Sequence, residues 1–180
     1  MRIIAGKYRG RQIQSSRDRS IRPTTSKIKE YIFQILDDFP VDARTLDMFS
    51  GSGGLGIEAL SRGAGSITFV DLAHSSLKVL RNNLERIGIE EPYQTLQKDV
   101  IPFLKKNPTP YELIFADPPF KWSKFDEFLP LVFAKNNLTD DGIFVLEYER
   151  SHQIDWSTIP CEILREKQYD RSIIVFARRK

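Results

Sequence analysis

Two hydrophobic periods alternate along the chain. Apolar residues from Ile28 to Leu36 recur at intervals of three and four and predict a helix that begins near Thr25. From residue 44 onward, short apolar runs typical of strands alternate with helical patterns. The predicted strands are Thr45–Phe49, Ser66–Val70, Tyr93–Gln97, Glu112–Ala116, Ile143–Glu147, Glu162–Gln168 and Ser172–Ala177. The predicted helices are Leu55–Arg62, Leu77–Ile87, Ile101–Lys106 and Phe125–Lys135.

This alternation predicts an α/β fold, because parallel strands need a crossover helix between them. We expect a Rossmann-like, doubly wound, mostly parallel sheet of seven strands. The last two strands have no helical pattern between them and predict a hairpin that adds an antiparallel edge strand. In open sheets of this kind, ligands bind beyond the carboxyl ends of the strands. The turns that follow the strands are therefore the segments in which to look for chemistry.

The segment before the first helix is short and basic. Strands are expected at Arg2–Ala5 and Arg11–Gln14, around a turn at residues 6–10. Residues 1–30 hold nine Lys and Arg against two acids, a net charge of +7, whereas the whole chain carries +3. A basic arm on a near-neutral body is typical of a polyanion-binding appendage, and a solvated terminus is the alternative. We therefore divide the chain into a basic hairpin, residues 1–22, and a main domain, residues 23–180.

Composition excludes several classes of protein. The chain has 180 residues, of which 41% are hydrophobic and 28% charged, as expected for one globular domain. Cys161 is its single cysteine, and His74 and His152 are its only histidines, so we expect neither a disulfide nor a metal site and assign these three residues no role. No apolar run is long enough to cross a membrane, and the first residues lack the apolar core of a signal peptide. We therefore expect a cytoplasmic protein.

The turn after the first predicted strand is rich in glycine. Gly51-x-Gly53-x-x-Gly56 matches the dinucleotide fingerprint, although such turns also occur for purely structural reasons. Asp47, four residues before Gly51, would repel a pyrophosphate but suits the cationic amino group of S-adenosylmethionine. Asp71 ends the next strand, where a carboxylate accepts hydrogen bonds from ribose hydroxyls. The pattern therefore favours S-adenosylmethionine over NAD as the cofactor.

The turn after the third strand offers a second cofactor contact. Asp99 can reach the exocyclic amine of an adenine, with Leu72 and Val100 as apolar walls. Asp99 also stands where a side chain would cap the helix Ile101–Lys106, and both interpretations remain open.

The fourth predicted strand ends in Asp117-Pro118-Pro119-Phe120, which we take as the catalytic loop. Two prolines fix φ and remove backbone donors, so the loop presents acceptors. The Asp117 carboxylate and the Pro118 carbonyl can both accept hydrogen bonds from one planar amino group, and Phe120 can stack on a base. Two acceptors would draw the nitrogen of a nucleobase amine toward tetrahedral geometry and aim its lone pair at a methyl donor. A Pro-Pro turn that merely ends a strand is the alternative.

The sequence resembles the RsmD family of class I S-adenosylmethionine-dependent methyltransferases. The resemblance rests on Arg2–Arg11, Ile21–Thr25, Gly51–Gly63 and the Asp-Pro-Pro-Phe motif, with Asp47 and Asp71. It implies methylation of N2 of one guanine in 16S rRNA, on an assembled or nearly assembled small ribosomal subunit, by what we expect to be a monomer. Two departures are Asp71, where the family more often has glutamate, and Ala73, where it often has an acid.

The resemblance also implies which residues bind. Guanine would contact the loop Asp117, Pro118, Pro119 and Phe120. The cofactor would contact Asp47, Phe49, Ser50, Gly51, Ser52, Gly53, Asp71, Leu72, Asp99 and Val100. RNA would contact Arg2, Lys7, Arg9, Arg11, Arg22 and Thr24. Two alternatives are an adenine-N6 DNA methyltransferase and a cofactor-binding module that docks on RNA without catalysis.

Overall fold

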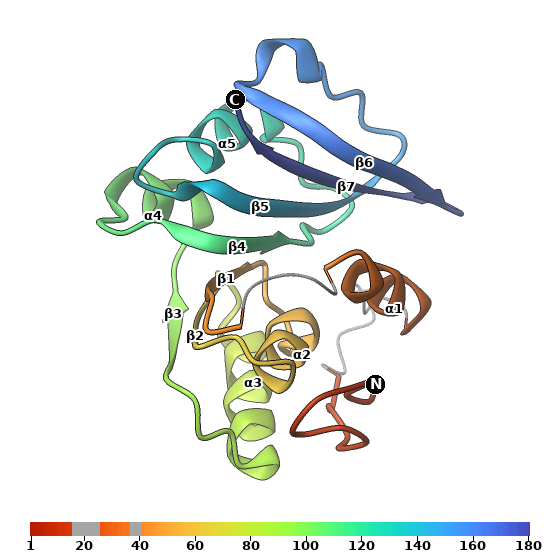
Figure 1. Ribbon diagram of the computed structural model, residues 1–180, viewed down its shortest axis with the longest axis vertical. Helices are drawn as coiled ribbons and strands as arrows, with labels where there is room; N and C mark the ends of the chain where they lie inside the picture. The colour runs from red at the N-terminus through yellow and green to blue at the C-terminus, as the bar shows by residue number, and fades with distance from the viewer. Residues whose placement is uncertain (16–25, 37–40) are drawn as a thin grey trace.

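The computed structural model describes residues 1–15, 26–36 and 41–180, and places seven strands in one sheet (Figure 1). The strand order is β3-β2-β1-β4-β5-β7-β6. The strands are β1 (Arg44–Met48), β2 (Ser66–Asp71), β3 (Tyr93–Gln97), β4 (Tyr111–Ala116), β5 (Leu138–Glu149), β6 (Cys161–Tyr169) and β7 (Ser172–Arg179). The helices are α1 (Ser26–Ile35), α2 (Gly54–Ser61), α3 (His74–Ile87), α4 (Val100–Lys106) and α5 (Phe125–Val132), with a 3-10 turn, η1, at Trp156–Thr158.

The predicted fold class is confirmed. β1 pairs in parallel with β2 and β4, β2 with β3, and β4 with β5. The antiparallel strand is β7, which lies between β5 and β6, so the outermost strand on this side is β6. The reversal of strand order between β1 and β4 places the turns after both strands side by side at one edge of the sheet.

Most predicted boundaries differ from the structure by one to a few residues, and two of the differences have a clear physical reason. The helix expected at Phe125–Lys135 ends at Val132, after Pro130 has removed one backbone donor near its end. The strand expected at Ile143–Glu147 begins earlier, at Leu138, because Leu138 pairs with Tyr111 ahead of a register shift. Asp140 and Asp141 lie in this extension and carry no strand pattern in the sequence.

The alternating side chains of the strands divide the core between the two faces of the sheet. Leu46, Met48 and Ile114 pack in one apolar cluster with buried residues of α4 and α5. Phe69 and Phe115 point to the other face and pack with buried residues of α1, α2 and α3 (Figure 1). The second cluster also takes in residues of the N-terminal segment, which is therefore part of this layer.

The N-terminal segment folds back on itself, but the two strands expected there do not form. Its one bridge pairs Arg2 with Gln12, supported by a hydrogen bond from Ile3 N to Arg11 O of 3.0 Å. The amides of Ile4 and Ala5 donate instead to the carboxylate of Glu58 in α2, at 2.8 and 3.0 Å. A regular ladder is lost because these donors are used by α2. Arg22, Thr24 and the expected boundary at residue 22 lie outside the described residues.

Candidate active site

One pocket of about 490 Å³ collects most of the predicted site residues. It lies beyond the carboxyl ends of β1, β2 and β4 and beside the turn that follows β3. The predicted residues that line it are Asp47, Phe49, Ser50, Gly51, Ser52, Asp71, Leu72, Asp99, Val100, Asp117, Pro118, Pro119 and Phe120. Sequence reasoning missed further lining residues, namely Met1, Gly54, Leu55, Ala73, Ser76, Lys98 and Trp122.

The glycine-rich turn after β1 is held by short hydrogen bonds. Gly51 N donates to Asp71 Oδ2 at 2.8 Å, and Gly53 N donates to Ser50 O at 2.8 Å. Phe49, Gly51 and Gly53 have positive φ angles of 56°, 53° and 85°, a conformation that glycine adopts freely and phenylalanine rarely. The chain therefore turns sharply at this point, and Gly51 lines the pocket without a side chain.

Gly53 does not line the pocket. A Cβ atom at this position would lie 2.4 Å from Leu80 Cδ1 and 2.9 Å from Ile57 Cδ1. Gly53 therefore allows α2 and α3 to pack closely. The predicted contact between Gly53 and a cofactor is not supported by the lining of the pocket.

Asp47 is almost completely buried beneath the turn, with 3% of its surface exposed. Its Oδ2 accepts a hydrogen bond of 2.9 Å from Gly56 N. A Cβ atom on Gly56 would lie 2.8 Å from that oxygen, so the contact requires glycine. Burial raises the pKa of Asp47 to about 8; the Gly56 amide opposes the rise, and the Asp71 charge adds to it. A cationic ligand group nearby would favour the ionised form.

Asp71 forms the neighbouring wall of the pocket. Besides Gly51 N, the Asp71 carboxylate accepts the amide of Ala73 at 2.8 Å through Oδ1. Burial raises the pKa of Asp71, and the two backbone donors lower it. Because each oxygen accepts one bond and has a second lone pair, the carboxylate can still accept bonds from a ligand.

Two buried hydroxyl groups in the pocket walls have no hydrogen-bond partner among the described residues. They are Ser50 Oγ and Ser76 Oγ, and Ser76 is fully buried. Buried polar atoms are normally satisfied, so these hydroxyls point to a polar ligand. Two acids, unpaired hydroxyls and apolar Leu72 and Val100 fit the amino, ribose and adenine groups of S-adenosylmethionine.

Asp99 caps α4. Its Oδ1 accepts the amide of Ile101 at 2.9 Å, which confirms the capping interpretation. The residue also lines the pocket, so contact with an adenine stays a prediction.

The Asp-Pro-Pro-Phe loop follows β4 and forms another part of the pocket wall. Pro118 is buried, whereas Asp117 and Phe120 are half-buried. Trp122 N donates to Pro119 O at 2.7 Å and closes the loop. His152 Nε2 lies 2.7 Å from Phe120 O; because a carbonyl oxygen only accepts, the ring nitrogen donates. His152 thus fixes the backbone of this loop from the segment after β5.

An aromatic cluster joins this loop to the glycine-rich turn. The Trp122 ring meets Phe49 edge-on at 5.1 Å between centroids, and meets Phe125 and Phe128 at 5.0 and 5.2 Å. Phe49 also contacts Phe128 at 5.9 Å. The rings pack the two loops against α5. Trp122 lies two residues beyond the motif, where no spacing rule indicates a contact with Phe49.

The basic residues of the N-terminal segment have mostly internal partners. Lys7 pairs with Glu90 and Glu91, each at 2.8 Å. Arg11 donates to the carbonyl of Ile87, and its guanidinium lies 5.1 Å from the centre of the Tyr8 ring. Arg2 donates to Gly10 O at 3.0 Å. Arg9 alone of the four has no partner among residues 1–15, 26–36 and 41–180.

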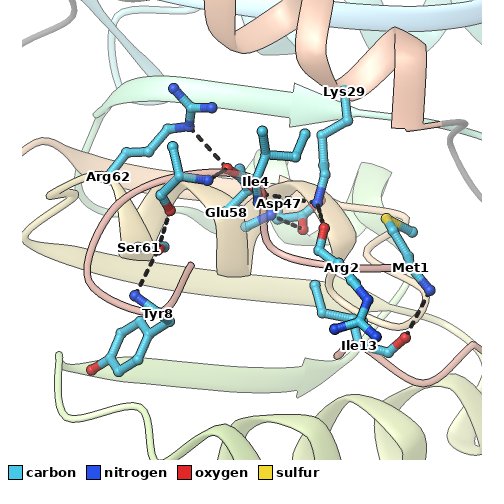
Figure 2. A network of polar contacts seen from close by, with 12 residues as sticks. Met1, Arg2, Ile4, Tyr8, Ile13, Lys29, Asp47, Glu58, Ser61 and Arg62 are labelled. Atoms are coloured by element: carbon cyan, nitrogen blue, oxygen red, sulfur yellow. Dashed lines mark hydrogen bonds and ion pairs between the residues drawn. The ribbon is translucent and has the colours of Figure 1, made fainter. Parts of the chain in front are cut away.

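A buried ionic network attaches this segment to α2 (Figure 2). Lys29 Nζ lies 2.9 Å from Glu58 Oε2 and donates to Arg2 O at 2.7 Å, and both charged side chains are fully buried. Arg62 Nε lies 3.0 Å from Glu58 Oε1. Burial lowers the pKa of Lys29 against the pull of Glu58. Because α2 begins at the glycine-rich turn, the contacts of Glu58 connect the N-terminal segment to the same helix that follows this turn.

Two further features concern the described residues only. No helix among them is long and apolar enough to cross a bilayer. No group of three or more His, Cys, Asp or Glu side chains there could hold a metal ion.

The sheet order, together with a pocket between an acid-flanked glycine turn and an Asp-Pro-Pro-Phe loop, defines a class I methyltransferase. The chain belongs to the RsmD family: the family model described as "Conserved hypothetical protein 95" matches residues 1–178.

Relatives of known name cover nearly the whole chain. "Putative rRNA methyltransferase YlbH" of Bacillus subtilis is 35% identical and covers 94% of each chain. "Ribosomal RNA small subunit methyltransferase D" of Escherichia coli is 32% identical over 93% of this chain and 84% of its own length. The solved structure of "Putative methyltransferase yhhF" of Escherichia coli superposes with a TM-score of 0.86, at 30% identity, over 100% of this chain and 98% of its own.

Proposed function

We propose that the protein transfers a methyl group from S-adenosylmethionine to N2 of one guanine in 16S rRNA of the small ribosomal subunit. The observation that carries this proposal is a single pocket lined both by Asp47 and Asp71 and by the Asp-Pro-Pro-Phe loop. Cofactor groups and a nucleobase amine can therefore lie next to each other. We further propose a monomeric cytoplasmic enzyme that acts on an assembled or nearly assembled subunit.

The cofactor half of the pocket offers a distinct group for each part of S-adenosylmethionine. Asp47 attracts the amino group, Asp71 accepts bonds from the ribose, and Asp99 with Leu72 and Val100 faces the adenine. The cofactor supplies an activated methyl group on a positively charged sulfur. The glycine-rich turn lets backbone approach the ligand closely, because no side chain projects at Gly51.

The target half of the pocket selects a flat amino group. The Asp117 carboxylate and the Pro118 carbonyl accept its two hydrogens, and the Phe120 ring stacks on the base. The amine is a weak nucleophile because its lone pair is shared with the ring. Two acceptors at fixed positions orient that lone pair, and orientation of this kind contributes on the order of 7–11 kcal/mol to a barrier reduction. The base must leave its stack to reach the pocket.

The RNA substrate is supported by the relatives, two of which are named for rRNA methylation. The net positive charge also suits a polyanion. The test uses purified protein, labelled S-adenosylmethionine and three acceptors, namely small subunits from a strain without the gene, naked 16S rRNA and duplex DNA. Nuclease digestion and mass spectrometry identify the methylated nucleoside.

We expect N2-methylguanosine from the subunits, and less or none from naked rRNA. N6-methyladenine in DNA would replace this proposal with the DNA methyltransferase alternative. Cofactor binding without transfer to any acceptor would favour the module without catalysis.

A further inference from the structure

Two lysines lie beside the target half of the pocket and have no assigned role. Lys121 and Lys124 flank Trp122, directly after Phe120. Both side chains are exposed and have no acidic partner among the described residues. Of the acids that follow in α5, Glu127 pairs with Lys105 at 2.7 Å. Their charge is therefore available to a ligand.

The backbone that carries these lysines is held in place. Phe120 O is bonded to His152, Pro119 O accepts the amide of Trp122, and the Trp122 ring packs against Phe49 and Phe125. Lys124 directly precedes α5, and its backbone carbonyl accepts the first hydrogen bond of the helix, from Phe128 N at 3.0 Å. The backbone of both lysines is thus held next to the residues that we propose to contact the base.

The N-terminal segment offers less free charge than its composition indicates. Lys7 is paired with two glutamates, and Arg11 and Arg2 donate to backbone carbonyls. A base that enters the pocket keeps its sugar and phosphates outside, next to the wall on which it stacks. The phosphates of that nucleotide would then lie beside the segment that follows Phe120 and carries Lys121 and Lys124.

We propose that Lys121 and Lys124 bind the backbone phosphates of the target nucleotide and its neighbour. This inference rests on the proposed function, because it requires an RNA strand that delivers a base to Phe120. Each lysine then acts as a point charge on a phosphate, and contributes affinity without reading the sequence.

The test compares the double variant Lys121→Gln/Lys124→Gln with wild type in binding to small subunits at several salt concentrations. Each lost phosphate contact should lower the slope of log affinity against log salt by about 0.7–0.9, and the two together should weaken binding about tenfold near 0.15 M salt. The matched control is Lys106→Gln/Lys135→Gln. These residues are also exposed and without a described partner. Lys106 is the last residue of α4 and Lys135 follows α5, at the edge of the sheet opposite the carboxyl ends of the strands.

A wild-type slope in the Lys121/Lys124 variant would overturn the inference, as would an equal loss in the control variant. Thermal melts and cofactor titrations verify that each variant is folded and binds S-adenosylmethionine. Failure of the proposed function shows differently, because the wild type itself would then not methylate the subunits, whether or not it binds them.

Discussion

The two halves of the pocket are built in opposite ways. In the cofactor half, Asp47 accepts the amide of Gly56 and Asp71 accepts the amide of Gly51. The helix that follows the turn, α2, is attached to α1 by the buried Glu58–Lys29 ion pair. In the target half, two prolines remove donors from the loop, and support comes from His152 and the rings around Trp122. Charge organises the cofactor half, whereas aromatic packing organises the target half.

This difference matches what each half has to do. A cofactor of constant structure can be held by groups that also hold the protein backbone. A weak nucleophile needs acceptors at fixed positions, and a loop whose two prolines carry no backbone N–H can hold them there. We therefore expect substitutions in the cofactor half to change stability and cofactor affinity, and substitutions in the target half to change turnover.

The largest effect should come from Asp117→Ala. Asp117 is the acceptor that we propose for the reacting amine, and its loss should lower kcat about 100-fold or more, by analogy with the removal of a charge-stabilising group in other active sites. The dissociation constant of S-adenosylmethionine should stay within about twofold, as measured by calorimetry. Asp126→Ala, at the start of α5 outside the pocket, is the control. Near-normal turnover in Asp117→Ala would contradict the division between the halves.

The second prediction concerns stability in the cofactor half. Lys29→Met leaves Glu58 buried with less positive charge and should lower the free energy of unfolding by about 3–5 kcal/mol. Urea denaturation measures the change. Lys27→Met, at an exposed position of the same helix, should change stability little. Equal stability of both variants would show that the network does not support the turn.

The third prediction is a pH dependence of stability. The pKa of Asp47 is raised to about 8 in the folded state, from an ordinary value near 4. Between these values the folded state keeps a proton that the unfolded state has lost, so stability falls as pH rises from 4 to 8.

Asp47→Asn removes this titration. The Tm of the variant should exceed that of the wild type by a margin that grows by several degrees from pH 5 to pH 9, since 1 kcal/mol corresponds to about 2–4 °C. Asp141→Asn, at an exposed position in β5, should show a constant margin. A constant margin for Asp47→Asn would refute the raised pKa.

The smallest effect is expected at His152. His152→Phe keeps a ring against Phe125, now 5.2 Å from the histidine ring, and removes the donor to Phe120 O. Loss of one hydrogen bond, worth about 1 kcal/mol, should lower kcat about fivefold. His152→Gln retains an N–H donor and should recover part of the loss, while the affinity for the cofactor stays close to wild type in both variants. Equal kcat values in the two variants would mean that the hydrogen bond does not position the loop.

Most of the fold and of the pocket could be predicted from the sequence, because their signals are local. The strand and helix periods predicted a sheet whose carboxyl edge gathers Asp47, Asp71, Asp99 and Asp117. The expected hairpin strands are wrong because a local pattern does not reveal that Glu58, more than fifty residues away, takes the amides of Ile4 and Ala5. Sequence reasoning assigned no role to His152, since no pattern links it to Phe120.

The sequence by itself determined which groups line the pocket, namely the acids at strand ends, the glycine of a sharp turn and the two prolines that lack a backbone N–H, because each depends on residues a few positions apart. Only the tertiary structure decided which charges remain for a ligand. Lys7 is paired by glutamates more than eighty residues away, whereas Lys121 and Lys124 are left exposed. Composition counts every lysine equally, but the strength of a charge toward RNA depends on its neighbours in space.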